Sequence, residues 1–209
     1  MNRISALSLV LAASISAASG AAISGVSGST TWLGVNPPNA QMFNLSGPNV
    51  FVWNEQVGVT SGANVNIASN GTFTGFAPYT AGTFSGGFAS HMVHFDPGFI
   101  PPFATGSVSF TQNIVAVIFD ESKLSATDAS MGALTTTYDT GSIFRSFNAD
   151  ILGFTSFTVI GNTLHYQFMQ SPGQINRMFE ARVITVVPTP GSLALIGLGG
   201  LVSLRRRAR

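Results

Sequence analysis

Apolar and polar residues alternate along most of the chain between residues 23 and 186, with the period of two that is typical of β-strands. β-branched and aromatic residues fill many of the apolar positions, and Gly, Asn, Pro and Ser interrupt the pattern every ten or so residues. No long segment has a helical period, and only residues 121–134 are expected to hold a helical turn or two. The pattern predicts an all-β fold, a single β-sandwich domain of jelly-roll type spanning residues 23–186.

One segment predicts a β-hairpin. Residues 157–160 and 163–168 alternate as strands, and Gly161-Asn162 between them suits the positive φ angles of a two-residue turn. The pattern also places His165 on the face opposite Leu164 and Tyr166, where an exposed histidine is expected.

Two further segments predict strands with different burial. Residues 106–119 read as two strands or one bent strand, and the second half is continuously apolar, which indicates a central strand buried on both faces. Residues 178–185 predict a last, half-exposed strand. Its apolar positions (Phe179, Ala181, Val183) alternate with Glu180, Arg182 and Ile184.

The N-terminal 22 residues have the three regions of a secretory signal peptide. Arg3 gives a positive start, residues 4–16 form a short apolar stretch, and residues 17–22 are small. Cleavage is expected after Ala21 or Ala22. The competing interpretation is a buried N-terminal helix, which the following Gly/Ser-rich run continues poorly.

The C-terminal segment, residues 187–209, combines paired prolines, an apolar run and a basic end. Pro188 and Pro190 stop any preceding strand or helix. As a helix, residues 191–204 would measure about 21 Å at ~1.5 Å per residue, short of a ~30 Å hydrocarbon core. The positive-inside rule keeps the terminal arginines cytoplasmic; they are Arg205, Arg206, Arg207 and Arg209.

This C-terminal arrangement resembles the PEP-CTERM sorting signal of Gram-negative bacteria. The motif reads Val187-Pro188-Thr189-Pro190-Gly191, with Thr189 where the family usually has glutamate. The resemblance implies Sec export with signal-peptidase cleavage, transient anchoring in the inner membrane, and processing by an exosortase near the prolines. The protein would then reach the cell surface or the extracellular matrix. The alternative is a plain C-terminal membrane anchor.

The middle of the chain also resembles a recurrent body of uncharacterised PEP-CTERM proteins. The matching residues are 90–96, 106–110 and 114–118. This resemblance does not point to any particular activity, because none is assigned to that body.

Charge and cysteine content exclude several functions. The chain is only 8% charged, and its net charge of +1 comes from the two ends. Residues 23–186 hold four basic and eight acidic residues, a net charge of −4, so no basic surface for nucleic acid is expected. Without cysteine, disulfides and thiolate metal sites are ruled out.

The most site-like cluster in the sequence is His91-x-x-His94-x-Asp96, because imidazole and carboxylate ligate divalent metals. On a strand, however, His94 and Asp96 share one face and His91 points to the other. The preferred interpretation is therefore a strand end whose His94 and Asp96 hydrogen-bond to a neighbouring loop.

Acidic residues of a second group offer oxygen ligands for calcium, namely Asp120, Glu121, Asp128 and Asp139. Their spacing matches no EF-hand. Surface loops are the preferred interpretation, with Asp120 a cap or turn residue at a strand end. We therefore assign no cofactor, and His94, Asp96 and Asp120 remain only weak metal candidates.

Catalytic motifs are weaker still. His165 has no Gly-x-Ser-x-Gly elbow to accompany it, and no pair of carboxylates suggests a glycosidase. The phenylalanines are expected mostly in the core, and Trp53 in the core or on a sheet face. We expect a non-enzymatic surface protein. A lectin-like module for exopolysaccharide is the first alternative and a secreted hydrolase the second.

Overall fold

The computed structural model describes residues 22–66, 71–74, 82–98, 103–145, 155–169 and 177–187. Almost all of the predicted signal peptide lies outside these residues. The predicted C-terminal helix, the arginine cluster and all of the sorting motif beyond Val187 also lie outside them.

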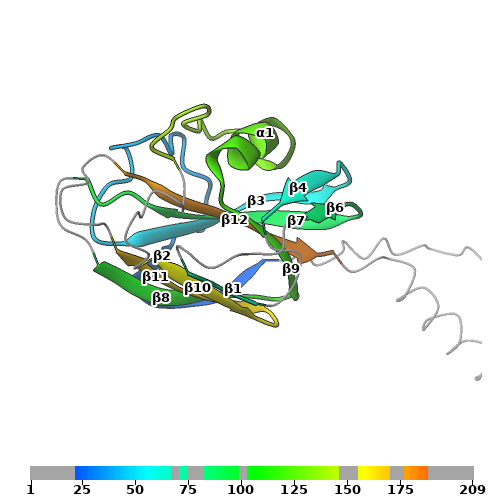
Figure 1. Ribbon diagram of the computed structural model, residues 1–209, viewed down its shortest axis with the longest axis horizontal. Helices are drawn as coiled ribbons and strands as arrows, with labels where there is room; N and C mark the ends of the chain where they lie inside the picture. The colour runs from blue at the N-terminus through cyan, green and yellow to red at the C-terminus, as the bar shows by residue number, and fades with distance from the viewer. Residues whose placement is uncertain are drawn as a thin grey trace, which may run out of the picture.

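Two five-stranded sheets, one above the other, form the body of the protein (Figure 1). Sheet A has the order β1 (Ile23–Gly28), β8 (Phe103–Phe110), β11 (Thr163–Met169), β10 (Ser156–Ile160) and β5 (Gly71–Thr74). Sheet B has the order β2 (Thr30–Trp32), β3 (Val50–Val59), β7 (Phe88–Phe95), β12 (Phe179–Val186) and β9 (Ile114–Ile118). The fold is mostly β, as the alternation predicts.

Smaller elements cover the outer face of sheet B. Helix α1 (Glu121–Met131) lies above that face, beside the two-stranded sheet of β4 (Ala63–Val65) and β6 (Gly82–Phe84) (Figure 1). The helix is three turns long, somewhat more than the sequence predicts.

The main hydrophobic core lies between the two sheets. Side chains that alternate inward along the strands of both sheets fill it, and phenylalanines contribute much of its volume. The side chains of Phe95 and Phe168 stack across the gap with ring centroids 5.5 Å apart. Burial of apolar area here, at roughly 25 cal/mol per Å², is the main force that holds the sheets together. Of the twelve phenylalanines whose side chains the structure describes, seven are buried, as expected for core residues, and Phe43, Phe103 and Phe144 are exposed.

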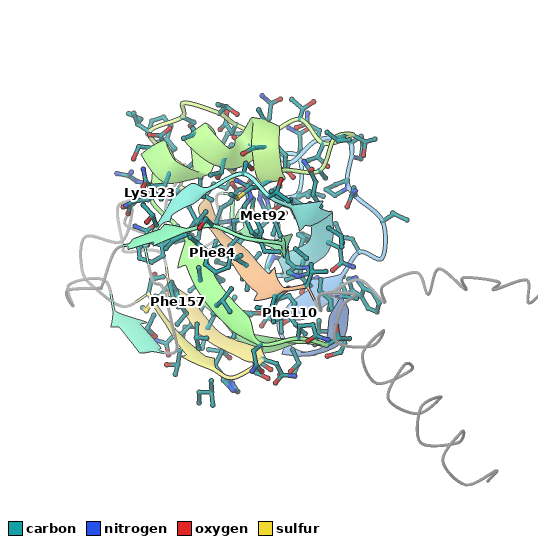
Figure 2. The ribbon with its side chains drawn as sticks, turned by 90° about the vertical axis from the view of Figure 1, so that its right-hand side faces the viewer. Phe84, Met92, Phe110, Lys123 and Phe157 are labelled. Atoms are coloured by element: carbon teal, nitrogen blue, oxygen red, sulfur yellow. The ribbon has the colours of Figure 1, made fainter. Side chains whose placement is uncertain are left out.

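A second apolar cluster lies between sheet B and α1. Trp53 and Met92 from the sheet pack in it with Leu124 and Met131 from the helix. Figure 2 shows Met92 beneath the helix that carries Lys123. Sheet B is therefore buried on both faces, which is why all eight residues of β7 are buried.

The β10–β11 hairpin forms as predicted. Ile160 pairs with Thr163 across Gly161-Asn162, and Gly161 adopts a φ of 59°, which glycine tolerates without strain. His165 is exposed between the buried Leu164 and Tyr166, also as predicted.

One prediction about strand position and one about burial are wrong. The apolar segment 114–118 is buried as predicted, but it is the edge strand β9 and not a central one; α1 and the β4–β6 pair cover its outer face. β12 is not half exposed, since Phe179–Thr185 are all buried. The alternation of β12 is real, but its polar face meets other protein groups instead of water.

Both ends of the described body meet at the turn between β8 and β9. The backbone of Ala22 exchanges hydrogen bonds with Thr111, whose amide donates to the Ala22 carbonyl (2.9 Å) and whose hydroxyl accepts from the Ala22 amide (3.0 Å). The Val186 amide donates to the Asn113 carbonyl at 3.3 Å. One short turn thus contacts the first and the last strand.

Candidate functional site

Ionisable side chains gather on the outer face of sheet B, enclosed by α1 and the loop that follows it. The outer-face cluster, as we call it, consists of Glu55, His94, Asp128, Tyr138, Arg145, Glu180 and Arg182. Strands β3, β7 and β12 supply four of these side chains, α1 supplies Asp128, and the loop supplies Tyr138 and Arg145. In a chain so poor in charge, this is the site where ionisable chemistry is concentrated.

Arg182 lies at one centre of the cluster. Its guanidinium donates to both carboxylate oxygens of Glu55, at 2.7 and 2.9 Å. It also donates to the Leu124 carbonyl, the Thr127 hydroxyl and the Asp128 carboxylate, all on α1. A single side chain of the sheet therefore holds the helix through charge and backbone contacts.

Arg145 lies at the second centre. It donates to both oxygens of Asp128, at 2.6 and 2.9 Å, and its Nε–H donates to Glu180. The other Glu180 oxygen is 2.7 Å from His94 Nδ1. Because Asp128 meets both Arg145 and Arg182, it joins the two halves of the cluster.

Tyr138 packs against both guanidinium groups. Arg145 and Arg182 lie 5.4 and 5.5 Å from its ring centroid, within cation–π range. Its hydroxyl donates to Glu55 at 2.6 Å and accepts from the Ala133 amide at 2.8 Å. The loop after α1 is thereby fixed over the sheet.

Burial and neighbouring charges together fix the protonation state of four members of the cluster. Glu180, Arg145 and Arg182 stay charged, and Tyr138 stays neutral. Burial by itself would raise the pKa of Glu180, but Arg145 and His94 outweigh it and lower that pKa to about 2. Burial would likewise lower the pKa of Arg145 and Arg182, yet their carboxylate partners raise both above the usual value. Burial and the neighbouring Glu55 raise the pKa of Tyr138. None of these four groups is poised to exchange a proton near neutral pH.

His91 belongs to a separate polar group on the inner face of sheet B. Its Nδ1 is 2.8 Å from the Asn54 side-chain oxygen and its Nε2 is 2.9 Å from the Thr185 hydroxyl. Burial lowers its pKa to about 3, so it is neutral over most of the pH range. The expected opposition of His91 and His94 across the sheet is confirmed.

The sequence-predicted metal candidates have separate partners. Asp96 accepts hydrogen bonds from the backbone amides of Phe43 and Gly98, which is the loop contact predicted for it. His94 instead contacts Glu180 on the neighbouring strand. Asp120 accepts from Asn66 and pairs with Lys123 at the start of α1. Over the described ranges, no three histidine or acidic side chains come together in a way that could hold a metal ion.

The acidic residues considered for calcium also have different partners. Asp128 is bound by two arginines, and the side chain of Glu121 accepts from Ser125 within the helix. Carboxylates that already neutralise cations are poor calcium ligands.

The sequence did not point to Glu55, Tyr138, Arg145, Glu180 or Arg182 as members of one site. One feature of the sequence could have indicated the cluster. Glu180 and Arg182 carry opposite charges at alternate positions of a strand, in a domain with only twelve charged residues. Such residues share a face, and a shared face with paired charges can be buried as well as exposed.

A hollow of about 410 Å³ lies beside the cluster, between the second half of α1 and the loop that follows it. Four of its lining residues carry aliphatic hydroxyl groups, namely Ser125, Thr136, Thr137 and Thr140. The Thr140 hydroxyl donates to Asp128 at 2.6 Å, so the hollow reaches the edge of the cluster.

Comparisons with family models, with curated proteins and with solved structures find no match for this chain. Within the part of the chain that the structure covers, no helix has the length and apolar character needed to span a membrane.

Proposed function

We propose that this is a non-enzymatic, exported surface or extracellular-matrix protein whose β-sandwich, of jelly-roll type, is a stable folded body carried between two sorting signals. The observation that carries the proposal is the closure of the outer-face cluster. Its arginines and carboxylates bind one another and are at most 9% exposed. Side chains arranged in this way are committed to one another and offer no reactive group to a substrate.

The strand topology supports the jelly-roll assignment. From β1 to β9, the strands of the two main sheets cross repeatedly between them: β1 lies in sheet A, β2 and β3 in B, β5 in A, β7 in B, β8 in A and β9 in B. Repeated crossing between two packed, mainly antiparallel sheets is the usual feature of jelly rolls.

Sorting by an exosortase is supported by the sequence resemblance of residues 187–191. We expect the double substitution Pro188→Ala with Pro190→Ala to block processing. The measurement is mass spectrometry of the C-terminus of the surface-released protein. Pro101→Ala with Pro102→Ala is the matched control, because it also replaces two prolines and is more than 80 positions before the motif in the sequence. An identical, processed C-terminus in the motif variant would refute exosortase sorting.

Sugar binding is the second candidate, and the hollow beside α1 favours it. Hydroxyl-rich walls and a volume of about 410 Å³ suit a polar ligand of the size of a sugar. A glycan array tests this alternative. Binding that is lost in Thr137→Trp, which would fill the hollow from an exposed position, supports it, and no binding at millimolar concentration rejects it.

A further inference from the structure

Two buried ring nitrogens on the outer face of sheet B have no hydrogen-bond partner among the described residues. They are Nε1 of Trp53, on β3, and Nε2 of His94, on β7. Both residues are fully enclosed, and their ring centroids lie 5.9 Å apart with the rings tilted by 49°. The strands are adjacent, since Trp53 pairs with Met92 two positions before His94.

Two such atoms on one face of the sheet require an explanation. Buried polar groups are nearly always hydrogen-bonded, and leaving one unpaired is costly. Buried waters typically bridge polar groups of this kind, and one water within hydrogen-bond distance of each nitrogen would satisfy both. The two rings lie on the same face of adjacent strands with centroids 5.9 Å apart, so both unpartnered nitrogens belong to one buried region of the outer face.

The neighbouring hydrogen bonds define which chemistry the bridge must have. Arg145 donates to one oxygen of Glu180, and His94 Nδ1 must donate to the other, because an ionised carboxylate only accepts. The indole of Trp53 can only donate. The bridging group must accept from Trp53 and also satisfy the second nitrogen of His94, whether that nitrogen carries a proton or not.

Water meets these requirements and the alternatives do not. A metal cation would be repelled by the indole N–H. An anion would accept from Trp53 but would enter a cluster with three carboxylates and two guanidinium groups. Water is neutral, accepts from Trp53, and can either donate to His94 or accept from it.

We propose that one internal water molecule bridges Trp53 Nε1 and His94 Nε2 and completes a hydrogen-bonded chain from Trp53 through His94 to Glu180 and Arg145. The water belongs to the structure and fixes the ring of His94 against β12. This inference stands apart from the proposed function, because it depends only on the packing of sheet B.

Water–protein cross-relaxation in the full-length, ¹⁵N-labelled protein tests the proposal, because the chain has only two tryptophans. Trp32→Phe assigns the two indole signals, and Trp32, which is 47% exposed, is the internal control. We expect the Trp53 indole proton to show a cross-peak to water with the sign of a long-lived bound molecule. Trp32 should show only exchange with bulk water. Absence of a bound-water cross-peak at Trp53 would overturn the proposal.

A crystal structure of the unaltered protein gives an independent result that does not rely on a variant's folding. A single density peak within about 3.2 Å of both nitrogens supports the bridge. Side chains in direct contact, or either nitrogen bonded to another protein group, would overturn it.

Discussion

The carboxylate of Glu55 and the guanidinium of Arg182 form a two-pronged ion pair across a strand that separates them. Glu55 is on β3, Arg182 is on β12, and β7 lies between the two in sheet B. Both side chains are completely enclosed. The pair therefore ties three strands together on the same face that receives α1.

Removing the cation of this pair should be costly. Arg182→Met leaves Glu55 buried without its guanidinium and removes one of the two arginines that bind Asp128, and breaking such a buried pair typically costs about 3–5 kcal/mol. We expect a loss of that size in the free energy of unfolding, measured by urea denaturation. Lys123→Met is the control: it breaks a pair with Asp120 that is 24% and 18% exposed, so about 0–1 kcal/mol is expected. Equal losses in the two variants would contradict this account of the cluster.

His91 should make stability depend on pH in the mildly acidic range. Its folded-state pKa, about 3, lies below the ordinary 6.5, so the unfolded chain takes up the proton first. The contribution is fully present above about pH 6.5 and is lost as the pH falls toward 3, at up to about 1.4 kcal/mol per pH unit. Unfolding measured between pH 6.5 and 4.5 should show a flatter dependence in His91→Gln than in the unaltered protein.

The exposed His165 provides the control for that measurement, since His165→Gln changes no buried group. Its pH dependence should run parallel to that of the unaltered protein. If the stability of His91→Gln showed the same pH dependence as that of the unaltered protein, burial of a neutral His91 would not explain that dependence.

Glu180 acts at lower pH. Its folded-state pKa of about 2 lies below the ordinary 4.5, so its contribution is present above pH 4.5 and is lost as the pH falls toward 2. Glu180→Gln should therefore be much less stable than the unaltered protein at pH 7, and the difference should shrink below pH 4.5. Denaturant unfolding of both proteins across this range measures the difference. A difference that stays constant down to pH 2 would disprove the role of the ionised carboxylate.

Gly106, on β8, lies where β1, β2 and β11 come close together. A Cβ atom at this position would lie 2.3 Å from the Ser27 carbonyl oxygen and 2.6 Å from the Tyr166 hydroxyl. Gly106→Ala should destabilise the protein by about 1–3 kcal/mol, the usual cost of overpacking. Gly25→Ala is the control on the neighbouring strand, because nothing lies within 4 Å of its added Cβ. Thermal unfolding compares them, and equal melting temperatures would argue against the close contact.

Local sequence patterns predicted the strands well, but they did not predict that the outer face of sheet B is buried. Gly161-Asn162 and the alternation around His165 are determined by neighbouring residues, so the hairpin could be predicted from the sequence. The burial of Glu180 and Arg182 depends on α1 and on Arg145, which lie far away in the chain. A period of two shows that these side chains share a face, but it cannot show what covers that face.

The contacts of Ala22 and Val186 with the β8–β9 turn have a mechanical consequence. The two ends of the described chain, residues 22 and 187, both lie next to the β8–β9 turn, at ends of the β1–β8 and β12–β7 ladders. Tension applied between residues 22 and 187 would therefore break the hydrogen bonds of these ladders one after another instead of shearing many at once. The domain should yield to a pull on its ends at low force, even though the core between its sheets is densely packed.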